Sequence, residues 1–473
     1  QEAAVCFYVS ACVLLHPSKI PAMQMPARRV SCGQHVAPWR MVIFGIVQFV
    51  FFCKVDATRP MADAAPFVLH NGTIYTMAVP PYAAALCVWG GRISAAGSEE
   101  EVFGSPCAIT AGKERTIDLH GATVVPGLTD SHAHLMMEAA RRTKADLRSA
   151  RSADAAAKAA AVFARMHPNL VRESGGWVQG FGWDQTQWPG GRFPTRSDLD
   201  ALFPDVPVLL EQLSGHACWV NSKALSIAEA DIPKSGDPPG GHVERDADGH
   251  PTGILSDAAV GLVAKHIPPL SDAAADQALT AVLWDCASHG LTGVHDLDML
   301  AADVELLRER HHRGELTLRV YGFRDGAEGS PTDPHVTTED GMLTVRGVKF
   351  FADGAMGSWS AAMLQPYSDK PETSGTMVYS RETFLTNVSA WASRGYQLAT
   401  HAIGDAANRQ VLDVYAQLLS QPAHKGHDRR WRIEHAQILA AEDLPKFAQF
   451  AVLASMQPSH CASDLSYAQH RLG

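Results

Sequence analysis

The sequence predicts an α/β fold: a TIM-type (β/α)8 barrel preceded by a small β-rich domain. Two patterns predict it. From Ser131 onward, short apolar runs alternate with helical stretches, which is typical of a parallel sheet with helical crossovers. Before that point, residues 67–129 form short runs of alternating and β-branched residues separated by turns. A chain of 473 residues is long enough for one large barrel and a smaller partner domain.

The β-rich segment contains two turn signals. Asn71-Gly72 lies within FVLHNGTIYTM, and Gly90-Gly91 lies within ALCVWGGRISAAG. The segment TIDLHGATVVPGLTDSHAHL then runs into an apolar strand, expected at 123–128, which leads to a histidine pair. We therefore expect a β-domain over 61–125 that leads directly into a barrel over 126–473.

Eight strand candidates make up the predicted barrel. One early candidate, VPVLLEQ or another, could instead lie in a segment that leaves the barrel. They are residues 123–128 and the segments VPVLLEQ, LTGVHDL, LTLRVYGF, VRGVKFFAD, YQLATHA, RRWRIEHAQ and FAVLASMQP. Helices are expected at 153–166, 273–289, 301–313, 381–393 and 408–419. Residues 175–253, rich in Gly, Pro and Trp, are predicted to form a long loop insertion over the active face.

Composition excludes several classes of protein. The chain is 46% hydrophobic and 19% charged, which is ordinary for a soluble globular protein. A formal charge of −10 argues against nucleic acid as a partner, because nucleic-acid binders normally present a basic face. The nine cysteines include no C-x-x-C pair, which excludes a zinc ribbon and gives no sign of a disulfide framework.

Residues 1–60 differ from the rest and form a predicted leader. Met41 to Cys53 is an apolar run of 13 residues, too short to span a bilayer comfortably. It follows Arg28, Arg29 and Arg40, as the core of a signal peptide would. The alternative is a mispredicted leader, with translation starting at Met41 or Met61. The protein is expected to be cytoplasmic if translation starts at Met61, and secreted or membrane-associated if the run is a signal.

Several polar side chains fall at or near the ends of the predicted strands. His132 and His134 alternate at the end of the first strand, Lys349 lies inside VKFFAD, and His401 and His435 end two later strands. The strand ends of a parallel barrel converge on one face, so distant residues can share a metal. Four imidazoles could hold one or two zinc ions and acidify a bound water, which would become the nucleophile.

The motif PGLTDSHAH resembles the first-strand signature of the amidohydrolase superfamily. The wider chain is similar to its branch of large metal-dependent amidohydrolases resembling N-substituted formamide deformylase. The resemblance covers about residue 67 to the end, and 1–60 lie outside it. Its other segments are GWDQTQWPGGRFPTRSDLDALFPDVPV, GHACWVNSKAL, DADGHPTGIL, VKFFADGAMGS, HAIGDAAN and RIEHAQ.

The resemblance implies a metal-bearing barrel flanked by a β-sandwich made from both chain ends. It implies that His132 and His134 are first-strand ligands, and that His401 and His435 are the fifth- and sixth-strand ligands. Lys349 matches a fourth-strand lysine that many members carboxylate to bridge two metals. The alternative is a buried lysine paired with Asp353. The expected cofactor is a divalent metal, Zn²⁺, as one or two ions.

Further residues are assigned by the same resemblance. Those that resemble substrate-pocket elements could equally be loop-packing residues: Trp183, Gln185, His216 and Asn221. Asp130 is expected to support the ligand that follows it. Asp405 is expected to orient a neighbouring group or cap the next helix rather than act as the base.

The chain ends at QHRLG before any eighth strand, so we expect a barrel truncated before strand 8. The family carries its proton-transferring aspartate there; Asp464 lies in a polar loop and does not replace it, so no catalytic residue is assigned. The predicted activity is hydrolysis of a non-peptide carbon–nitrogen bond in a small molecule by a metal-activated water. Alternatives are an inactive truncated scaffold, or a deaminase or esterase on the same site. A homo-oligomer is left open.

Overall fold

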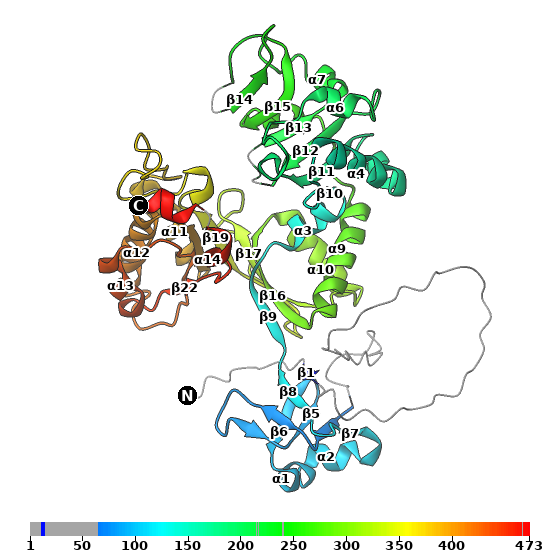
Figure 1. The fold of residues 1–473 in the computed structure, drawn as a ribbon. Helices are drawn as coiled ribbons and strands as arrows, with labels where there is room; N and C mark the ends of the chain where they lie inside the picture. Colours follow the sequence, from blue (N-terminus) through cyan, green and yellow to red (C-terminus); the bar gives the residue numbers. More distant parts are fainter. Residues whose placement is uncertain (1–10, 15–64, 214, 216, 239–240, 466) are drawn as a thin grey trace, which may run out of the picture. The chain divides into compact units, whose positions relative to one another are not determined.

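A computed structural model describes residues 11–14 and 65–473, apart from 214, 216, 239–240 and 466 (Figure 1). His216 and nearly all of the predicted leader, including its apolar run at 41–53, lie outside the described residues. The described chain forms two compact units. The first comprises the described residues up to Ala133 together with Cys286–Leu300 and Leu307–Gly473, and the second comprises His134–Asp285 and Ala301–Leu306.

Two four-stranded sheets form the β-rich start of the first unit. The first has the order β6-β5-β2-β7 and the second β1-β8-β3-β4. Buried side chains from both sheets, including Leu69, Ile74 and Val124, share one hydrophobic cluster. The strands are β1 (Ala11–Leu14), β2 (Phe67–His70), β3 (Thr73–Tyr75), β4 (Tyr82–Ala83), β5 (Ala85–Trp89), β6 (Arg92–Gly97), β7 (Thr116–Asp118) and β8 (Thr123–Pro126). Helices α1 (Glu99–Phe103) and α2 (Pro106–Ala111) lie between β6 and β7.

The two predicted turns have different outcomes. Gly90 and Gly91 adopt φ of 57° and 73° and join β5 to β6 as an antiparallel hairpin, as predicted. Asn71-Gly72 instead joins β2 to β3, which belong to different sheets. The chain turns from one sheet to the other there, because Leu69 and Ile74 both reach the shared core.

One cysteine pair departs from the expectation that the cysteines carry no sign of disulfides. Cys87 on β5 and Cys107 on α2 form a disulfide with a Cα–Cα distance of 6.2 Å. Both residues are buried, and they join a strand to the helix that covers it. Their spacing of 20 residues forms no sequence motif, so only the packing of α2 on β5 reveals the pair.

Seven parallel strands form a nearly closed barrel in the first unit, in the order β22-β21-β20-β19-β17-β16-β9. The predicted first strand at 123–128 is wrong in its position. Residues up to Pro126 form β8 in the β-rich sheets, and the first barrel strand is β9 (Leu128–Ala133). The others are β16 (Leu291–Met299), β17 (Arg319–Asp325), β19 (Leu343–Phe351), β20 (Gln397–Ala402), β21 (Arg432–His435) and β22 (Leu453–Ser455), while β18 (Val336–Thr337) pairs with β19.

Helices cross between successive barrel strands, as the alternating pattern predicts. The predicted helix at 381–393 is α11 (Arg381–Ser393), and α12 (Asp405–Leu419) begins three residues earlier than predicted. Their apolar faces and the strands beside them build the largest core cluster, with Val348, Phe384, Val411 and Ile433 fully buried. The remaining helices of this part are α10 (Ala301–His312), α13 (Leu444–Gln449), α14 (His460–Ser463) and α15 (Ala468–Leu472).

The stretch 175–253, predicted as a loop insertion, lies outside the barrel sheet but is not a loop, because it contains strands of the second unit. It contributes to a six-stranded sheet of order β10-β11-β12-β13-β15-β14. VPVLLEQ forms β12 (Val208–Gln212) here and not in the barrel. The other strands are β10 (Ala145–Asp146), β11 (Val178–Trp183), β13 (Ala217–Val220), β14 (Gly241–Arg245) and β15 (Pro251–Asp257).

Helices around this sheet include the predicted one at 153–166, which is α4 (Ala153–Met166). Ser152 caps it by accepting a hydrogen bond from the Ala155 backbone N–H. The second unit also contains α3 (Leu135–Arg142), α5 (Pro168–Glu173), α6 (Arg196–Asp200), α7 (Ser222–Ile227), α8 (Val260–Ala264) and most of α9 (Asp272–Ser288). Within the described chain, none of the helices combines the length and apolar character needed to cross a membrane.

Candidate metal centre

Histidines from three barrel strands meet at the carboxyl ends of those strands. His132 lies in β9, His401 in β20 and His435 at the end of β21. The His132 and His435 rings are 4.8 Å apart between centroids, and those of His435 and His401 are 4.7 Å apart. The His435 ring is therefore close to both of the other rings. The structure thus brings together three of the predicted ligands, and His134 follows β9 as the residue before α3.

The backbone is strained at His435 and at the residue that follows it. His435 and Ala436 adopt φ of 70° and 43°, in the left-handed region that side-chain-bearing residues rarely enter. Such strain is typical of functional sites, where surrounding contacts enforce the conformation. The left-handed turn ends β21 at His435.

Each of the three imidazoles has one nitrogen held by an oxygen of the protein. His132 Nδ1 donates to Glu434 Oε2 at 2.7 Å, and His435 Nδ1 donates to Gln457 Oε1 at 2.7 Å. His401 Nε2 donates to the Gly354 carbonyl oxygen at 3.0 Å. Metal-binding histidines typically donate their second N–H to such a partner, which fixes the tautomer and the ring orientation.

Two of the three histidines, His401 and His435, are held in the uncharged form that binds metals. Burial, offset in part by the Gly354 hydrogen bond, lowers the pKa of His401 to about 4. Burial and repulsion from His401 lower the pKa of His435 to about 3. A metal ion competes with protons for imidazole nitrogens, so neutral histidines are ready to bind one.

Lys349 is buried on the neighbouring strand β19, with 1% of its surface exposed. Its Nζ lies 4.7 Å from the centre of the Phe351 ring, and burial lowers the pKa of the amine to about 8. Lys349 does not form the ion pair with Asp353 that was the alternative prediction. The Asp353 carboxylate instead accepts backbone N–H groups of Ala362, Ile403 and Gly404 at 2.8 to 3.0 Å.

These side chains fit a divalent metal. The rings of three partly buried histidines lie close together, and the buried amine of Lys349 lies beside the Phe351 ring, where an unmodified charge is costly. Nitrogen ligands of this kind suit zinc and similar ions. Asp353 lies close to the same group, with its Oδ1 3.5 Å from His401 Nε2, and burial raises its pKa to about 6 despite the three backbone donors.

A buried ion pair that sequence reasoning missed supports the first ligand. Arg432 and Glu434, both on β21, form two hydrogen bonds of 2.7 and 2.8 Å. Burial opposes charge on Glu434, but the hydrogen bonds from His132 and Arg432 prevail and lower its pKa to about 2. The carboxylate therefore holds the His132 ring. Arg432 also donates to His295 Nδ1 at 2.7 Å and to the Ser131 carbonyl at 2.7 Å.

A carboxyl pair, also missed, lies near Lys349 on the ends of β16 and β17. Burial and the neighbouring Asp325 carboxylate raise the pKa of Asp298 to about 7, while the pKa of Asp325 is lowered. Asp325 accepts backbone N–H groups of Ala327 and Glu328, which stabilise its charge. Two adjacent carboxyl groups can therefore share one proton.

Two aspartates predicted to support the site make backbone contacts. Asp130 Oδ1 accepts the His132 backbone N–H at 3.0 Å. Asp405, the first residue of α12, accepts the Leu364 backbone N–H at 2.7 Å, whereas Gly404 is the residue at the cap position. Asp405 therefore orients a neighbouring segment and does not cap the helix.

The described residues assigned to the substrate pocket pack the sheet of the second unit. Asn221 is fully buried, accepts from Val208 and Ala224 N–H groups, and donates to two carbonyls. Trp183 is fully buried and donates its indole N–H to the Leu210 carbonyl. Gln185 accepts a hydrogen bond from Gln212 at 2.6 Å. These contacts are those expected of residues that pack the protein interior. A role for the same residues in substrate binding stays a prediction.

A second cluster of ligand-type side chains lies on the turn between β14 and β15. Among the described residues, the group with all its ligand atoms within 4.8 Å of one another is Asp246, Asp248 and His250. All three are exposed. Asp246 Oδ1 accepts the backbone N–H groups of Asp248 and His250, so the turn itself accounts for the arrangement.

A nearly closed parallel barrel with histidines at the carboxyl ends of its strands defines a class, the metal-dependent hydrolases. The comparisons identify the family within that class. The model of the amidohydrolase family (Amidohydro_3) matches residues 115–473. The chain belongs to the amidohydrolase family, and it is a metal-dependent hydrolase of that superfamily.

Named relatives agree with this assignment. YtcJ of Bacillus subtilis, a protein assigned as an amidohydrolase, is 34% identical over 86% of this chain and 75% of its own. The N-substituted formamide deformylase of Arthrobacter pascens is 31% identical over 80% of this chain and 70% of its own. A solved structure of an uncharacterized metal-dependent hydrolase from Pyrococcus horikoshii OT3 matches with a TM-score of 0.68 and 27% identity, covering 86% of this chain and 77% of its own.

Proposed function

We propose that the protein hydrolyses a non-peptide carbon–nitrogen bond of the amide type, such as that of an N-substituted formamide. The observation that carries the proposal is the group of three partly buried histidines, His132, His401 and His435, whose rings lie close together at the carboxyl ends of barrel strands. Similarity to a formamide deformylase supports this bond type over an ester or an amidine. The metal would be held by His132, His134, Lys349, His401 and His435, with Zn²⁺ as the expected ion.

When bound, a divalent metal polarises a substrate carbonyl and makes a water acidic enough to attack near neutral pH. The residues of this chain prepare the site for it. Glu434 accepts the Nδ1 proton of His132, and Gln457 accepts that of His435, so each ring would present Nε2 to the metal. Gly354 accepts the Nε2 proton of His401, which leaves Nδ1 as its ligand atom. These contacts orient the ligands before the metal arrives.

We further propose that Lys349 is carboxylated. Its amine is buried, and the nearby Asp353 is occupied by backbone N–H groups. In this step the uncharged Nζ forms a bond to the carbon of CO₂ and releases one proton, giving a carbamate anion. A carbamate supplies two oxygens that can bridge two metal ions, which an amine cannot do.

Metal removal and reconstitution test the proposed reaction. Chelation of the purified protein is expected to abolish more than about 90% of its turnover of N-substituted formamides, and Zn²⁺ is expected to restore it. The matching esters serve as competitors, and a preference for esters would contradict the assigned bond type. Undiminished turnover by metal-free protein would overturn the metal-dependent reaction.

Lys349→Met tests the carbamate, with Lys113→Met as the control because Lys113 is exposed and far along the chain from the site. Loss of a bridging group is expected to lower the bound metal by about half, from two ions to one per chain. Wild-type protein incubated with ¹³C-bicarbonate should show a carbamate signal that Lys349→Met lacks. A wild-type protein with no such signal would refute carboxylation while leaving the hydrolase proposal intact.

A further inference from the structure

A pocket of about 450 Å³ lies among the last turns of α11 and α12 and the loop 420–430. These segments precede β20 and β21, so the pocket is at the amino ends of the barrel strands. The metal centre is at their carboxyl ends, on the opposite face of the barrel. The volume falls within the range of small-molecule sites, about 300–1,000 Å³. The pocket is therefore separate from the proposed metal centre.

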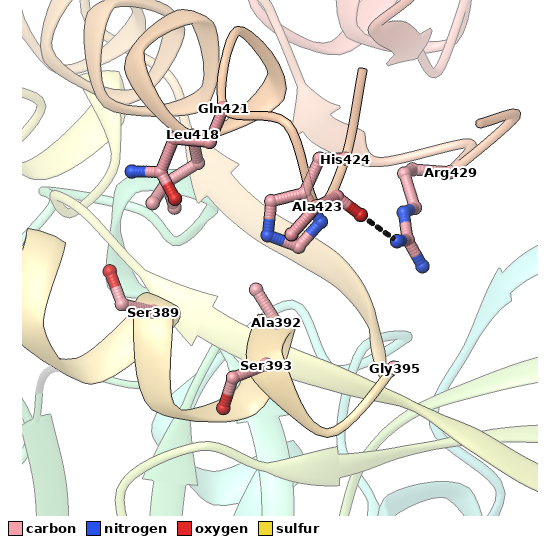
Figure 2. Close-up of a pocket in the computed structure, with 9 residues that line it drawn as sticks. All are labelled: Ser389, Ala392, Ser393, Gly395, Leu418, Gln421, Ala423, His424 and Arg429. Atoms are coloured by element: carbon pink, nitrogen blue, oxygen red, sulfur yellow. Dashed lines mark hydrogen bonds between the residues drawn. The ribbon is translucent and has the colours of Figure 1, made fainter. Parts of the chain in front are cut away.

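Buried polar atoms without partners point to a ligand there. His424 is 7% exposed, and among the described residues its Nδ1 has no hydrogen-bond partner. The buried Nε of Arg429 also lacks a partner within that part of the chain, although its Nη2 donates to the Ala423 carbonyl at 2.7 Å. Figure 2 shows the His424 ring amid the lining side chains, with Arg429 to one side and Leu418 to the other. A buried polar group without a hydrogen-bond partner is unfavourable, so a ligand that pairs with these two atoms would be stabilised.

The charges of the lining favour an anionic group beside Arg429. The nine lining residues include one full cation, Arg429, and no carboxylate. Burial and the nearby Arg429 charge lower the pKa of His424, so the imidazole stays neutral. A ligand carboxylate that accepts from Arg429 Nε–H would give this donor a partner in a charge-assisted hydrogen bond. The exposed Lys425 adds a second positive charge to the same loop, although the net charge of the whole chain is −10.

The opposite wall favours a hydrogen-bond donor with positive charge. Ser389 and Ser393 lie in the last two turns of α11, and Leu418 lies in the last turn of α12. The C-terminal ends of helices carry partial negative charge, which favours cations. Both serine hydroxyls already donate to helix carbonyls, Leu385 and Ala390, so their oxygens are left as acceptors. The apolar lining comes from both sides: Ala392 lies beside the two serines on α11, and Leu418 lies beside Gln421 at the end of α12.

We propose that this pocket binds a small amino carboxylate with an apolar side chain, such as a free aliphatic amino acid. Its carboxylate would accept from Arg429 and His424, its amino group would donate to Ser389 and Ser393, and its side chain would lie against Leu418. The proposal is independent of the reaction proposed above, because none of these residues belongs to the metal centre.

Calorimetric titration with L-leucine tests the proposal. The full chain is dialysed free of metal and chelator, so that the amino acid has no metal to coordinate. Leucine is expected to bind with a dissociation constant of about 10 mM or tighter. Leucinamide, which lacks the carboxylate, and 4-methylpentanoate, which lacks the amine, should each bind at least about tenfold more weakly. Equal binding of either analogue would overturn the assignment.

Three variants locate the site. Arg429→Gln should weaken leucine binding at least about tenfold, and Ser393→Phe, at an exposed lining position, should block the pocket with the fold intact. Arg430→Gln is the matched control, because this exposed neighbour pairs with Asp428 and does not line the pocket. Absence of leucine binding to the wild type, or unchanged binding by Ser393→Phe, would refute the proposal.

Discussion

At the scale of single residues, Gln457 offers a test of ligand orientation with little structural cost. Its Oε1 accepts the Nδ1 proton of His435, and it is only partly buried in the loop after β22. Gln457→Leu removes that acceptor and leaves the tautomer of His435 unfixed. We expect zinc affinity, measured by competition with a chromogenic chelator, to fall about 10–100-fold. Gln449→Leu, at an exposed position on α13, is the control, and equal zinc affinities of the two variants would contradict the role assigned to Gln457.

His295 links a single proton to the stability of the barrel. Arg432 Nη1 donates to its Nδ1, so the ring must stay neutral, and burial together with the Arg432 charge lowers its pKa to about 4. Free histidine titrates near about 6.5, so the unfolded chain takes up the proton first as pH falls. The stability from this residue is complete above about pH 6.5 and is lost as pH falls towards about 4.

His295→Asn keeps an oxygen acceptor for Arg432 but does not titrate. Its free energy of unfolding should fall less between pH 7 and pH 4.5 than that of the wild type, by on the order of 2 kcal/mol after discounting for partial exposure. Urea unfolding of both metal-free proteins at the two pH values measures this difference. Identical losses of stability would show that His295 is not a source of acid sensitivity.

The strand-end histidines could be predicted from the sequence because alternation and strand position alone bring them to one face. His132, His401 and His435 needed no knowledge of side-chain geometry. Glu434 and Arg432 were within reach too, because residues two apart on a strand lie on the same face, where opposite charges can pair. Gln457 and Asp298 could not be found, because their contacts depend on how strands β16 and β22 are placed beside their neighbours.

At the scale of elements, the Cys87–Cys107 disulfide fixes α2 to the sheet that contains β5. Closing a loop across a spacing of 20 residues restricts the unfolded chain and should contribute about 3 kcal/mol. The double variant Cys87→Ala/Cys107→Ala is expected to lose about that much stability in chemical unfolding under oxidising conditions. Cys461→Ala, at an exposed cysteine, should lose almost none. A double variant as stable as wild type would mean that the β-rich part does not depend on the crosslink.

Helices with strong periodicity and clear ends were predicted closely, and α4 and α11 begin and end where expected. A serine caps the start of each helix. The residues buried along each helix then recur at helical spacing. Strand membership was harder, because a short apolar run does not say which sheet it joins. VPVLLEQ illustrates the difficulty, since Val208 pairs with Val178 on β11 in the second unit. The Gly-rich and Trp-rich stretch was mistaken for a loop because its strands are separated by many turns.

At the scale of the whole molecule, the chain contains two units with cores of their own. The largest cluster of the described residues draws on the barrel and its helices, whereas the clusters around Trp219 and Val220 draw on the second unit. Separate cores allow separate unfolding transitions, so a single free energy of unfolding need not describe this protein. A change inside one core should alter one transition in calorimetry and leave the other in place.

Asn221→Ala tests both this organisation and the role of Asn221. The side chain makes four hydrogen bonds within the second unit, and its loss leaves buried N–H and C=O groups unpaired. We expect about 3 kcal/mol less stability in the transition of the second unit, with unchanged zinc affinity, because the metal centre is built on barrel strands. Ser226→Ala, at an exposed position on helix α7, which Asn221 caps, is the control. If Asn221→Ala instead raised KM for formamide substrates at unchanged stability, Asn221 would be a substrate contact, and packing would not explain its place in the sequence.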